Sequence, residues 1–175
     1  MASAWSRCRS SAATSAYRLV NSEGDGLPGL NIDVFGDVAA VQFSALGMKL
    51  HEDAVYAALR TLPSPPLCIV EAAAGSFANI EGFASQNRVV FGDESLLADG
   101  TLCLENGVRL RIDVREGQKT GAFLDQRDNR LLFGRYCAGA KVLGNIEVGA
   151  EARIASGSVV LTNVPPRCTV KPSSV

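Results

Sequence analysis

Turn signals separate β-patterned runs of residues, and this alternation limits the possible fold more than any other feature of the sequence. Residues 23–29, EGDGLPG, contain three glycines and a proline, which mark a loop. The runs LNIDVF and VAAVQF then flank Gly36-Asp37, so they predict two strands joined by a tight turn. A second pair of runs, in residues 101–114, meets at Asn106-Gly107, a dipeptide favoured in two-residue hairpins. The pattern therefore predicts antiparallel strands connected in hairpins.

One helix is expected between these hairpins. Residues 48–62, MKLHEDAVYAALRTL, place apolar side chains at helical spacing, and the following PSPP ends the helix. The short apolar run LCIV indicates a buried strand, whereas residues 71–87 have no regular period and predict an irregular connection. Together these features predict an α+β fold from residue 17 to about residue 114.

Composition excludes several classes of protein. The chain has 175 residues, 47% of them hydrophobic and 20% charged, as in an ordinary globular protein. The formal net charge of −1 provides no overall attraction to nucleic acid or anionic membranes. No apolar run reaches the roughly eighteen residues of a membrane-spanning helix, so we expect no membrane partner.

The cysteines and the N-terminus bear on metal binding and location. Five cysteines lie far apart without a CxxC pair, and His51 is the only histidine, so we expect no metal site and reduced thiols in the cytoplasm. Residues 1–16 are rich in Ser, Ala and Arg and contain no acidic residue. We expect this segment to be disordered, and organellar targeting is the alternative interpretation.

The end of the chain follows a different period. Val142, Val148, Ile154 and Val160 recur every six residues with small residues between them. A six-residue period is typical of hexapeptide repeats that coil into a left-handed β-helix. Because a β-helix needs about three or more coils, these few hexads predict a truncated β-helix-like tail over residues 141–175.

Residues 117–130, GQKTGAFLDQRDNR, here called the motif segment, have two interpretations. In the structural one, the glycines allow tight turns, and Thr120 or Asp125 caps a helix that runs toward Tyr136. The buried stripe of that helix would consist of Leu124, Leu131 and Leu132. In the functional one, glycine amides and Lys119 bind an anion while Asp125 binds a hydroxyl or amine. The residue pattern by itself favours the structural interpretation.

Two long stretches, residues 17–37 and 105–130, resemble the ribosomal RNA large-subunit cytosine-5 methyltransferase family, and the similarity extends over about residues 17–142. The resemblance implies the central α+β domain of that family and the entry to its catalytic domain. It also implies S-adenosyl-L-methionine (SAM) as cofactor and ribosomal RNA as partner. By position, the cofactor-binding residues would be Lys119, Thr120, Gly121, Phe123, Asp125, Gln126 and Arg127. Ala122 departs from the aromatic residue usual in the family.

Beyond residue 138 the resemblance changes. Residues 139–170 are similar to the C-terminal β-helix of serine O-acetyltransferases, and they replace the glycine-rich cofactor turn expected of a methyltransferase. We therefore expect a central domain at residues 17–116, a motif loop and helix at 117–140, and a hexapeptide remnant at 141–175. The predicted function is a truncated methyltransferase-like protein that has no catalytic residue and is inactive alone. The alternatives are an acetyltransferase-like remnant and a non-catalytic RNA- or protein-binding module.

Overall fold

The computed structural model describes residues 13–115, 117, 119–136, 153–154 and 169–170. The chain divides into two compact units, Met1–Leu131 and Leu132–Val175, which are considered separately below. Within the described residues, no helix is both long and apolar enough to cross a membrane.

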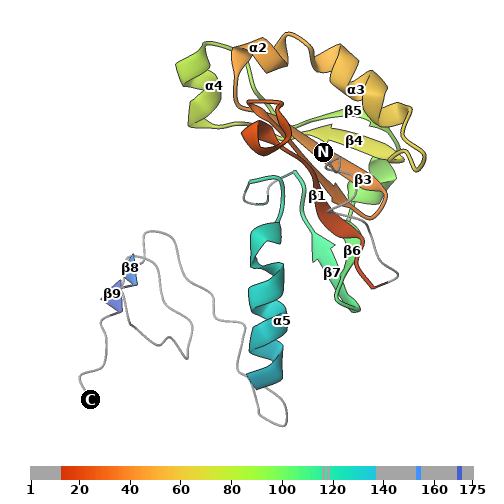
Figure 1. Ribbon diagram of the computed structural model, residues 1–175, viewed down its shortest axis with the longest axis vertical. Helices are drawn as coiled ribbons and strands as arrows, with labels where there is room; N and C mark the ends of the chain where they lie inside the picture. The colour runs from red at the N-terminus through yellow and green to blue at the C-terminus, as the bar shows by residue number, and fades with distance from the viewer. Residues whose placement is uncertain (1–12, 116, 118, 137–152, 155–168, 171–175) are drawn as a thin grey trace. The chain divides into compact units, whose positions relative to one another are not determined.

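A five-stranded sheet forms the centre of the first unit (Figure 1). Its strands lie in sequence order: β1 (Ala16–Asn21), β2 (Leu30–Phe35), β3 (Val38–Phe43), β4 (Cys68–Glu71) and β5 (Arg88–Gly92). All neighbours are antiparallel except β3 and β4, which are parallel. The hairpin predicted around Gly36-Asp37 is confirmed, since β2 and β3 pair from Leu30↔Phe43 to Phe35↔Val38.

Helices occupy the connections around the parallel pair. A parallel connection must cross over the sheet, and this one contains α2 (Leu46–Lys49) and α3 (Glu52–Arg60). The predicted single helix is thus correct in place but interrupted near His51. The prediction of an irregular connection was wrong for α4 (Ser76–Glu81), which lies between Gly75 and Gly82. Six residues are less than two helical turns, so α4 is too short to produce a recognisable period.

A second hairpin is formed by β6 (Thr101–Glu105) and β7 (Val108–Ile112), which confirms the prediction from Asn106-Gly107. Both turn residues have the positive φ that a type I′ turn requires, +51° and +82°. Backbone hydrogen bonds attach this hairpin to the residues before β1. Ser15 N donates to Leu104 O at 2.9 Å, and Gly107 N donates to Ala13 O at 2.7 Å.

Both faces of the sheet are buried. One cluster packs Ala39, Val41 and Phe43 of β3 against Tyr56 and Leu59 of α3. A second cluster packs the other face of the sheet against Cys103 of β6 and Leu97 of the 3-10 helix η2 (Glu94–Leu97). Burial on two sides explains why β3 and β4 read as nearly continuous apolar runs.

An ionic cluster ties α3 to the sheet beside the first core. The Glu71 carboxylate is 1% exposed. It accepts hydrogen bonds from Lys49 Nζ at 2.6 Å, Arg88 Nε at 2.8 Å and the Tyr56 hydroxyl at 3.0 Å. Burial, followed by the charge of Glu71 and its hydrogen bond, raises the pKa of Tyr56 well above its usual value. The cluster therefore keeps Tyr56 protonated as a donor to Glu71.

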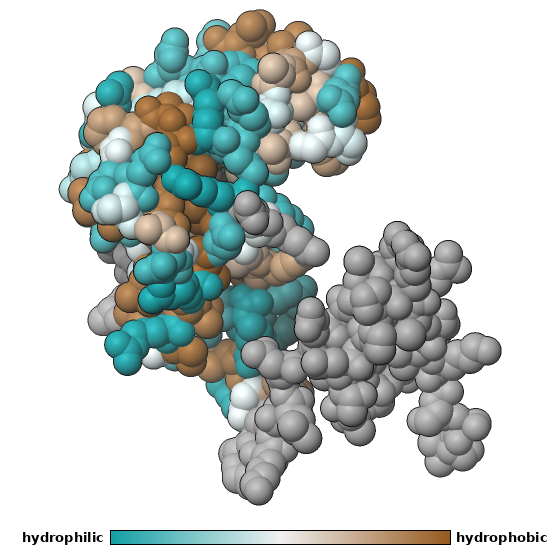
Figure 2. Space-filling view, turned by 180° about the vertical axis from the view of Figure 1, so that it is seen from behind, coloured by the Kyte–Doolittle hydropathy of each residue, from teal (hydrophilic) through white to brown (hydrophobic). Residues whose placement is uncertain are grey.

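Some large hydrophobic side chains remain at the surface of the first unit. Figure 2 shows hydrophobic and hydrophilic residues interleaved over this unit from behind. Leu50, Phe77 and Ile80 are 75%, 61% and 79% exposed. Surface residues of this kind are common singly in globular proteins.

The motif segment leads through a 3-10 helix, η3 (Leu124–Gln126), into α5 (Arg127–Tyr136). The helix toward Tyr136 is confirmed, but its predicted buried stripe is wrong, because Leu131 and Leu132 are 44% and 49% exposed. The capping role predicted for Thr120 is also wrong, since its hydroxyl donates to Asp33. No side chain caps η3, and capping of α5 by Asp125 stays a prediction. Only Leu124 of the three leucines packs against a core, so polar contacts rather than a leucine stripe hold the segment.

In the second unit, β8 (Arg153–Ile154) pairs in parallel with β9 (Thr169–Val170). The other hexad residues, Val142, Val148 and Val160, lie outside the described residues, as do residues 1–12. The left-handed β-helix and the disordered N-terminus therefore stay predictions.

Candidate functional site

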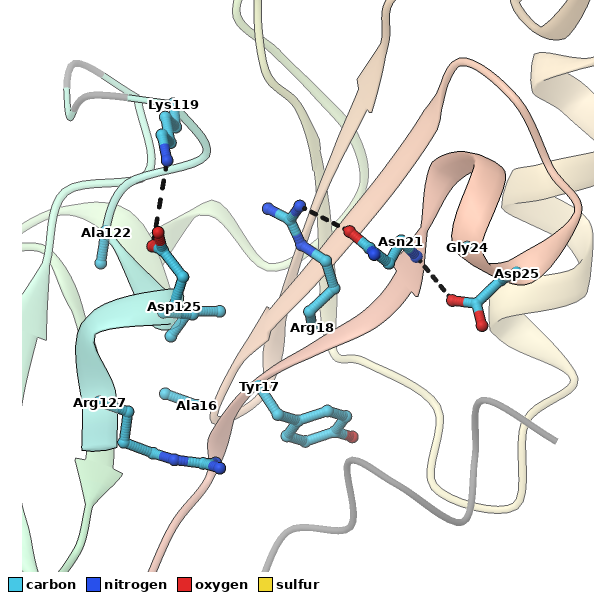
Figure 3. A pocket seen from close by; sticks show the side chains of 11 residues that line it. Ala16, Tyr17, Arg18, Asn21, Gly24, Asp25, Lys119, Ala122, Asp125 and Arg127 are labelled. Atoms are coloured by element: carbon cyan, nitrogen blue, oxygen red, sulfur yellow. Dashed lines mark hydrogen bonds and ion pairs between the residues drawn. The ribbon is translucent and has the colours of Figure 1, made fainter. Parts of the chain in front are cut away.

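A pocket of about 570 Å³ lies between the start of the sheet and the motif segment (Figure 3). One wall comes from β1 and from the 3-10 helix η1 (Ser22–Asp25) that follows it. The other wall comes from the motif segment. The lining residues are Ala16, Tyr17, Arg18, Asn21, Gly24 and Asp25 on the first wall, and Lys119, Ala122, Leu124, Asp125 and Arg127 on the second.

A buried carboxylate, Asp33 of β2, joins the two walls. Its two oxygens accept hydrogen bonds from Arg18 Nε at 2.7 Å and Arg18 Nη2 at 2.8 Å. The Thr120 hydroxyl donates to the same carboxylate. Asp33 is 0% exposed and Thr120 is 1% exposed, so the contact between them is shielded from water, whereas the contacts with Arg18 are partly buried. The carboxylate thus fixes a pocket-lining arginine and the motif loop to one strand.

Close approaches of neighbouring atoms explain the glycines of the motif segment. A Cβ at Gly117 would lie 2.2 Å from Asp113 O, and one at Gly121 would lie 2.8 Å from Ile112 Cγ2. Gly121 also has a φ of +130°, which side-chain-bearing residues rarely adopt. Lys119 itself has a φ of +58°. The glycines therefore serve the tight turn of the structural interpretation.

Charges of both signs face the pocket from the motif segment. Figure 3 shows the Lys119 ammonium pointing toward the Asp125 carboxylate, with Nζ 4.0 Å from Oδ1. The same ammonium lies 4.4 Å from the centre of the Phe123 ring. Arg127 adds a second cation, paired with Asp128 at 3.5 Å. Such a wall suits a zwitterionic ligand, because an ammonium can meet Asp125 while a carboxylate meets Lys119 or Arg127.

A second ion pair sets the position of η3 and the start of α5. Arg130 Nε and Nη2 donate to the two Glu105 carboxylate oxygens, each at 2.7 Å, and Nη2 also donates to Phe123 O at 3.0 Å. The hydrogen bond to Glu105 raises the pKa of Arg130 above its ordinary value. This bidentate contact links the motif segment to β6.

The structure places the seven predicted cofactor residues in different settings. Lys119, Asp125 and Arg127 line the pocket. Thr120 is buried against Asp33, Gly121 supports the turn, and neither Phe123 nor Gln126 is part of the pocket lining. Contact between any of them and a cofactor stays a prediction. Sequence reasoning missed Arg18, Asp33 and Glu105, which lie far from the segment in the chain.

The described cysteines are poor nucleophiles. Burial raises the pKa of Cys68, and burial together with the charge of Glu105 raises the pKa of Cys103 to about 11. Both are therefore neutral thiols near pH 7. Among the described residues, no three His, Cys, Asp or Glu side chains are grouped so as to hold a metal ion.

Comparison with curated proteins identifies relatives. The ribosomal RNA large subunit methyltransferase I of Aeromonas salmonicida is 37% identical over 127 residues, which are 73% of this chain and 31% of that protein. The enzyme of the same name from Escherichia coli O157:H7 is 36% identical over 129 residues, 73% of this chain and 32% of that protein. The chain thus spans about a third of the length of these relatives. No protein-family model matches the chain.

Comparison with solved structures also finds methyltransferases. A protein assigned as a SAM-dependent methyltransferase from Streptococcus mutans has a TM-score of 0.59 and 26% identity, and the match covers 82% of this chain and 33% of that chain. A crystal structure assigned as a methyltransferase complexed with SAH has a TM-score of 0.58 and 27% identity, covering 79% and 33%. The fold is therefore a mixed α/β arrangement found in methyltransferase structures. Over about 73% of its length, this chain is homologous to ribosomal RNA large subunit methyltransferase I.

Proposed function

We propose that the chain serves SAM-dependent methylation of ribosomal RNA at cytosine-5, and that the pocket beside the motif segment contributes to cofactor binding. The supporting observation is that Lys119, Asp125 and Arg127 lie together on the wall of one pocket. The names of the relatives supply methylation and the RNA class, and the neighbour solved with SAH supports the cofactor class. The cytosine-5 position rests on the sequence resemblance alone.

Charge complementarity indicates which part of SAM this wall would hold. The amino-acid end of the cofactor carries one ammonium and one carboxylate. Asp125 would accept from the ammonium, and Lys119 or Arg127 would donate to the carboxylate. These side chains are partly exposed, with Lys119 51% and Asp125 63% accessible. Two or three such hydrogen bonds are worth about 2–4 kcal/mol, and association costs at least about 4 kcal/mol. These contacts at most offset the cost of association, so the affinity of the motif segment alone is no tighter than about millimolar.

We further propose that the part of the chain that the structure describes does not complete the reaction by itself. Cytosine-5 transfer needs a cysteine thiolate that adds to the pyrimidine ring before the ring accepts the methyl group. Cys68 and Cys103 are buried thiols with raised pKa values, which argues against either in that role. Reduced thiols and a ribosomal substrate are consistent with a cytoplasmic location.

An NMR titration of the purified chain with SAM tests the proposal. We expect shifts of the backbone amides of Lys119, Asp125 and Arg127, with a dissociation constant of about 1 mM or weaker. Lys119→Ala and Asp125→Ala should each weaken binding further. Asp99→Ala is the matched control, because Asp99 is 89% exposed and is not part of the pocket lining.

Two results would contradict parts of this proposal. If SAM at roughly ten times the expected dissociation constant shifts none of these amide signals, the pocket is not a cofactor site. If the wild-type constant is low micromolar and is lost in Lys119→Ala, the segment binds the cofactor without further parts of a methyltransferase. Binding of a ribosomal RNA fragment without SAM binding would favour the non-catalytic RNA-binding module.

A further inference from the structure

A second, smaller cavity of about 210 Å³ lies in the first unit, beside the motif segment. Most of its wall is apolar and comes from four elements: Phe35 of β2, Cys103 of β6, Leu110 and Ile112 of β7, and Leu124 of η3. Its polar part is the Glu105–Arg130 pair. We call it the inner cavity.

The inner cavity adjoins the pocket at three shared residues. Ala16, Ala122 and Leu124 line both. Two of the three have only a methyl group as side chain, so little side-chain volume separates the two spaces at that point. Ala122 belongs to the motif loop and packs against the second core, so its side chain lies where the two spaces meet.

We propose that the inner cavity binds one small neutral aromatic ring, which enters from the pocket past Ala122. Size supports this, because an apolar cavity of about 150 Å³ is enough to hold benzene. Wall chemistry supports it too, since leucine, isoleucine and phenylalanine side chains offer water few hydrogen bonds.

The charged groups in the wall of the inner cavity are already paired, which favours a neutral ring. Glu105 and Arg130 satisfy each other through two hydrogen bonds of 2.7 Å, so neither requires a charged ligand. The raised pKa of Cys103 keeps the thiol neutral at pH 7. An ionised group placed in this cavity would lose hydration without gaining a counter-ion, which disfavours its binding.

Toluene is the probe, because it is neutral and carries a single ring. At ten times its dissociation constant, toluene should raise the midpoint of thermal unfolding of the wild-type chain by about 5 °C. In a methyl-labelled sample it should shift the methyl signals of Leu110, Ile112 and Leu124. These measurements do not involve SAM, so their failure would leave the proposed function untouched.

Filling the opening provides the second test. Ala122→Phe places a ring where the two spaces meet, and it should abolish the stabilisation by toluene. Ala57→Phe makes the same change at an exposed alanine of α3 and should preserve it. If Ala122→Phe does not fold, the methyl shifts of the wild-type chain still show whether toluene binds in the inner cavity. The proposal is wrong if toluene shifts none of the three residues, or if it stabilises the Ala122→Phe chain as strongly as the wild type.

A comparison of toluene with phenylalanine identifies the source of the ring. Phenylalanine joins the same ring to a zwitterion that could reach Lys119 and Asp125 in the pocket. If it shifts the same methyl groups, the ring belongs to a larger ligand that spans both spaces. If only toluene shifts these methyl groups, the cavity binds a free ring. Both results support binding in the inner cavity.

Discussion

Asp33→Ala should strongly destabilise the first unit, and the contacts of Asp33 set the magnitude. Removal of the carboxylate deletes three hydrogen bonds and removes the buried charge that pairs with the Arg18 guanidinium. Removing one partner of a buried ion pair costs about 3–5 kcal/mol. Because the Arg18 side chain is 32% exposed, water compensates part of this loss. We therefore expect about 3 kcal/mol, measured as the change in free energy of urea unfolding by circular dichroism.

A double-mutant cycle with Thr120→Val separates the contribution of the motif loop. The hydroxyl donates to a charged acceptor, so Thr120→Val alone should cost about 1.5–3 kcal/mol. In the Asp33→Ala background most of that cost should disappear, because the acceptor is already gone. Asp99→Ala is the control, since Asp99 is 89% exposed and should change stability by less than about 0.5 kcal/mol. A cost of Asp33→Ala below about 1 kcal/mol, or full additivity with Thr120→Val, would refute the reasoning.

Two further predictions concern buried ionisable groups. Glu71→Gln should cost about 2–4 kcal/mol in urea unfolding, because Lys49 and Arg88 lose the more buried of their two shared counter-ions and keep only Glu52. A cost below about 0.5 kcal/mol would contradict this. Stability should also fall as the pH rises from 9 toward 11. Cys103 keeps its proton in the folded state up to a pKa of about 11, whereas the unfolded thiol, at 9.0, releases it earlier. The free energy of unfolding should fall by about 2 kcal/mol over this range, and Cys103→Ala should reduce the fall. If the wild-type and Cys103→Ala chains lose stability with pH in parallel, Cys103 is not the group responsible.

Local signals predicted local structure well. The hairpins at Gly36-Asp37 and Asn106-Gly107 were predicted because a turn and its two flanking strands are contiguous in the sequence. The helix α4 was missed because its six residues show no period. The stripe of Leu131 and Leu132 was wrongly predicted to be buried, since periodicity cannot tell whether a neighbouring surface covers a helix face.

The polar contacts of the site could not be predicted in the same way. Arg18 and Asp33 are 15 residues apart, and Glu105 and Arg130 are 25 apart. Their pairing depends on strand register and on the path of the motif loop, and neither follows from residue type. The departure at Ala122 was visible in the sequence, but its position between two cavities required the structure.

The attachment of the β6–β7 hairpin to residues 13–15 has a consequence for synthesis on the ribosome. Leu104 N donates to Ser15 Oγ across 89 residues of sequence. At about 5–20 residues per second, translation leaves the early segment without these partners for about 4–18 s. During that time its backbone donors and acceptors are open to other chains or to chaperones. The nascent chain therefore relies on assisted folding during this interval more than a protein whose first residues pair only with their immediate neighbours, and slower elongation lengthens the interval.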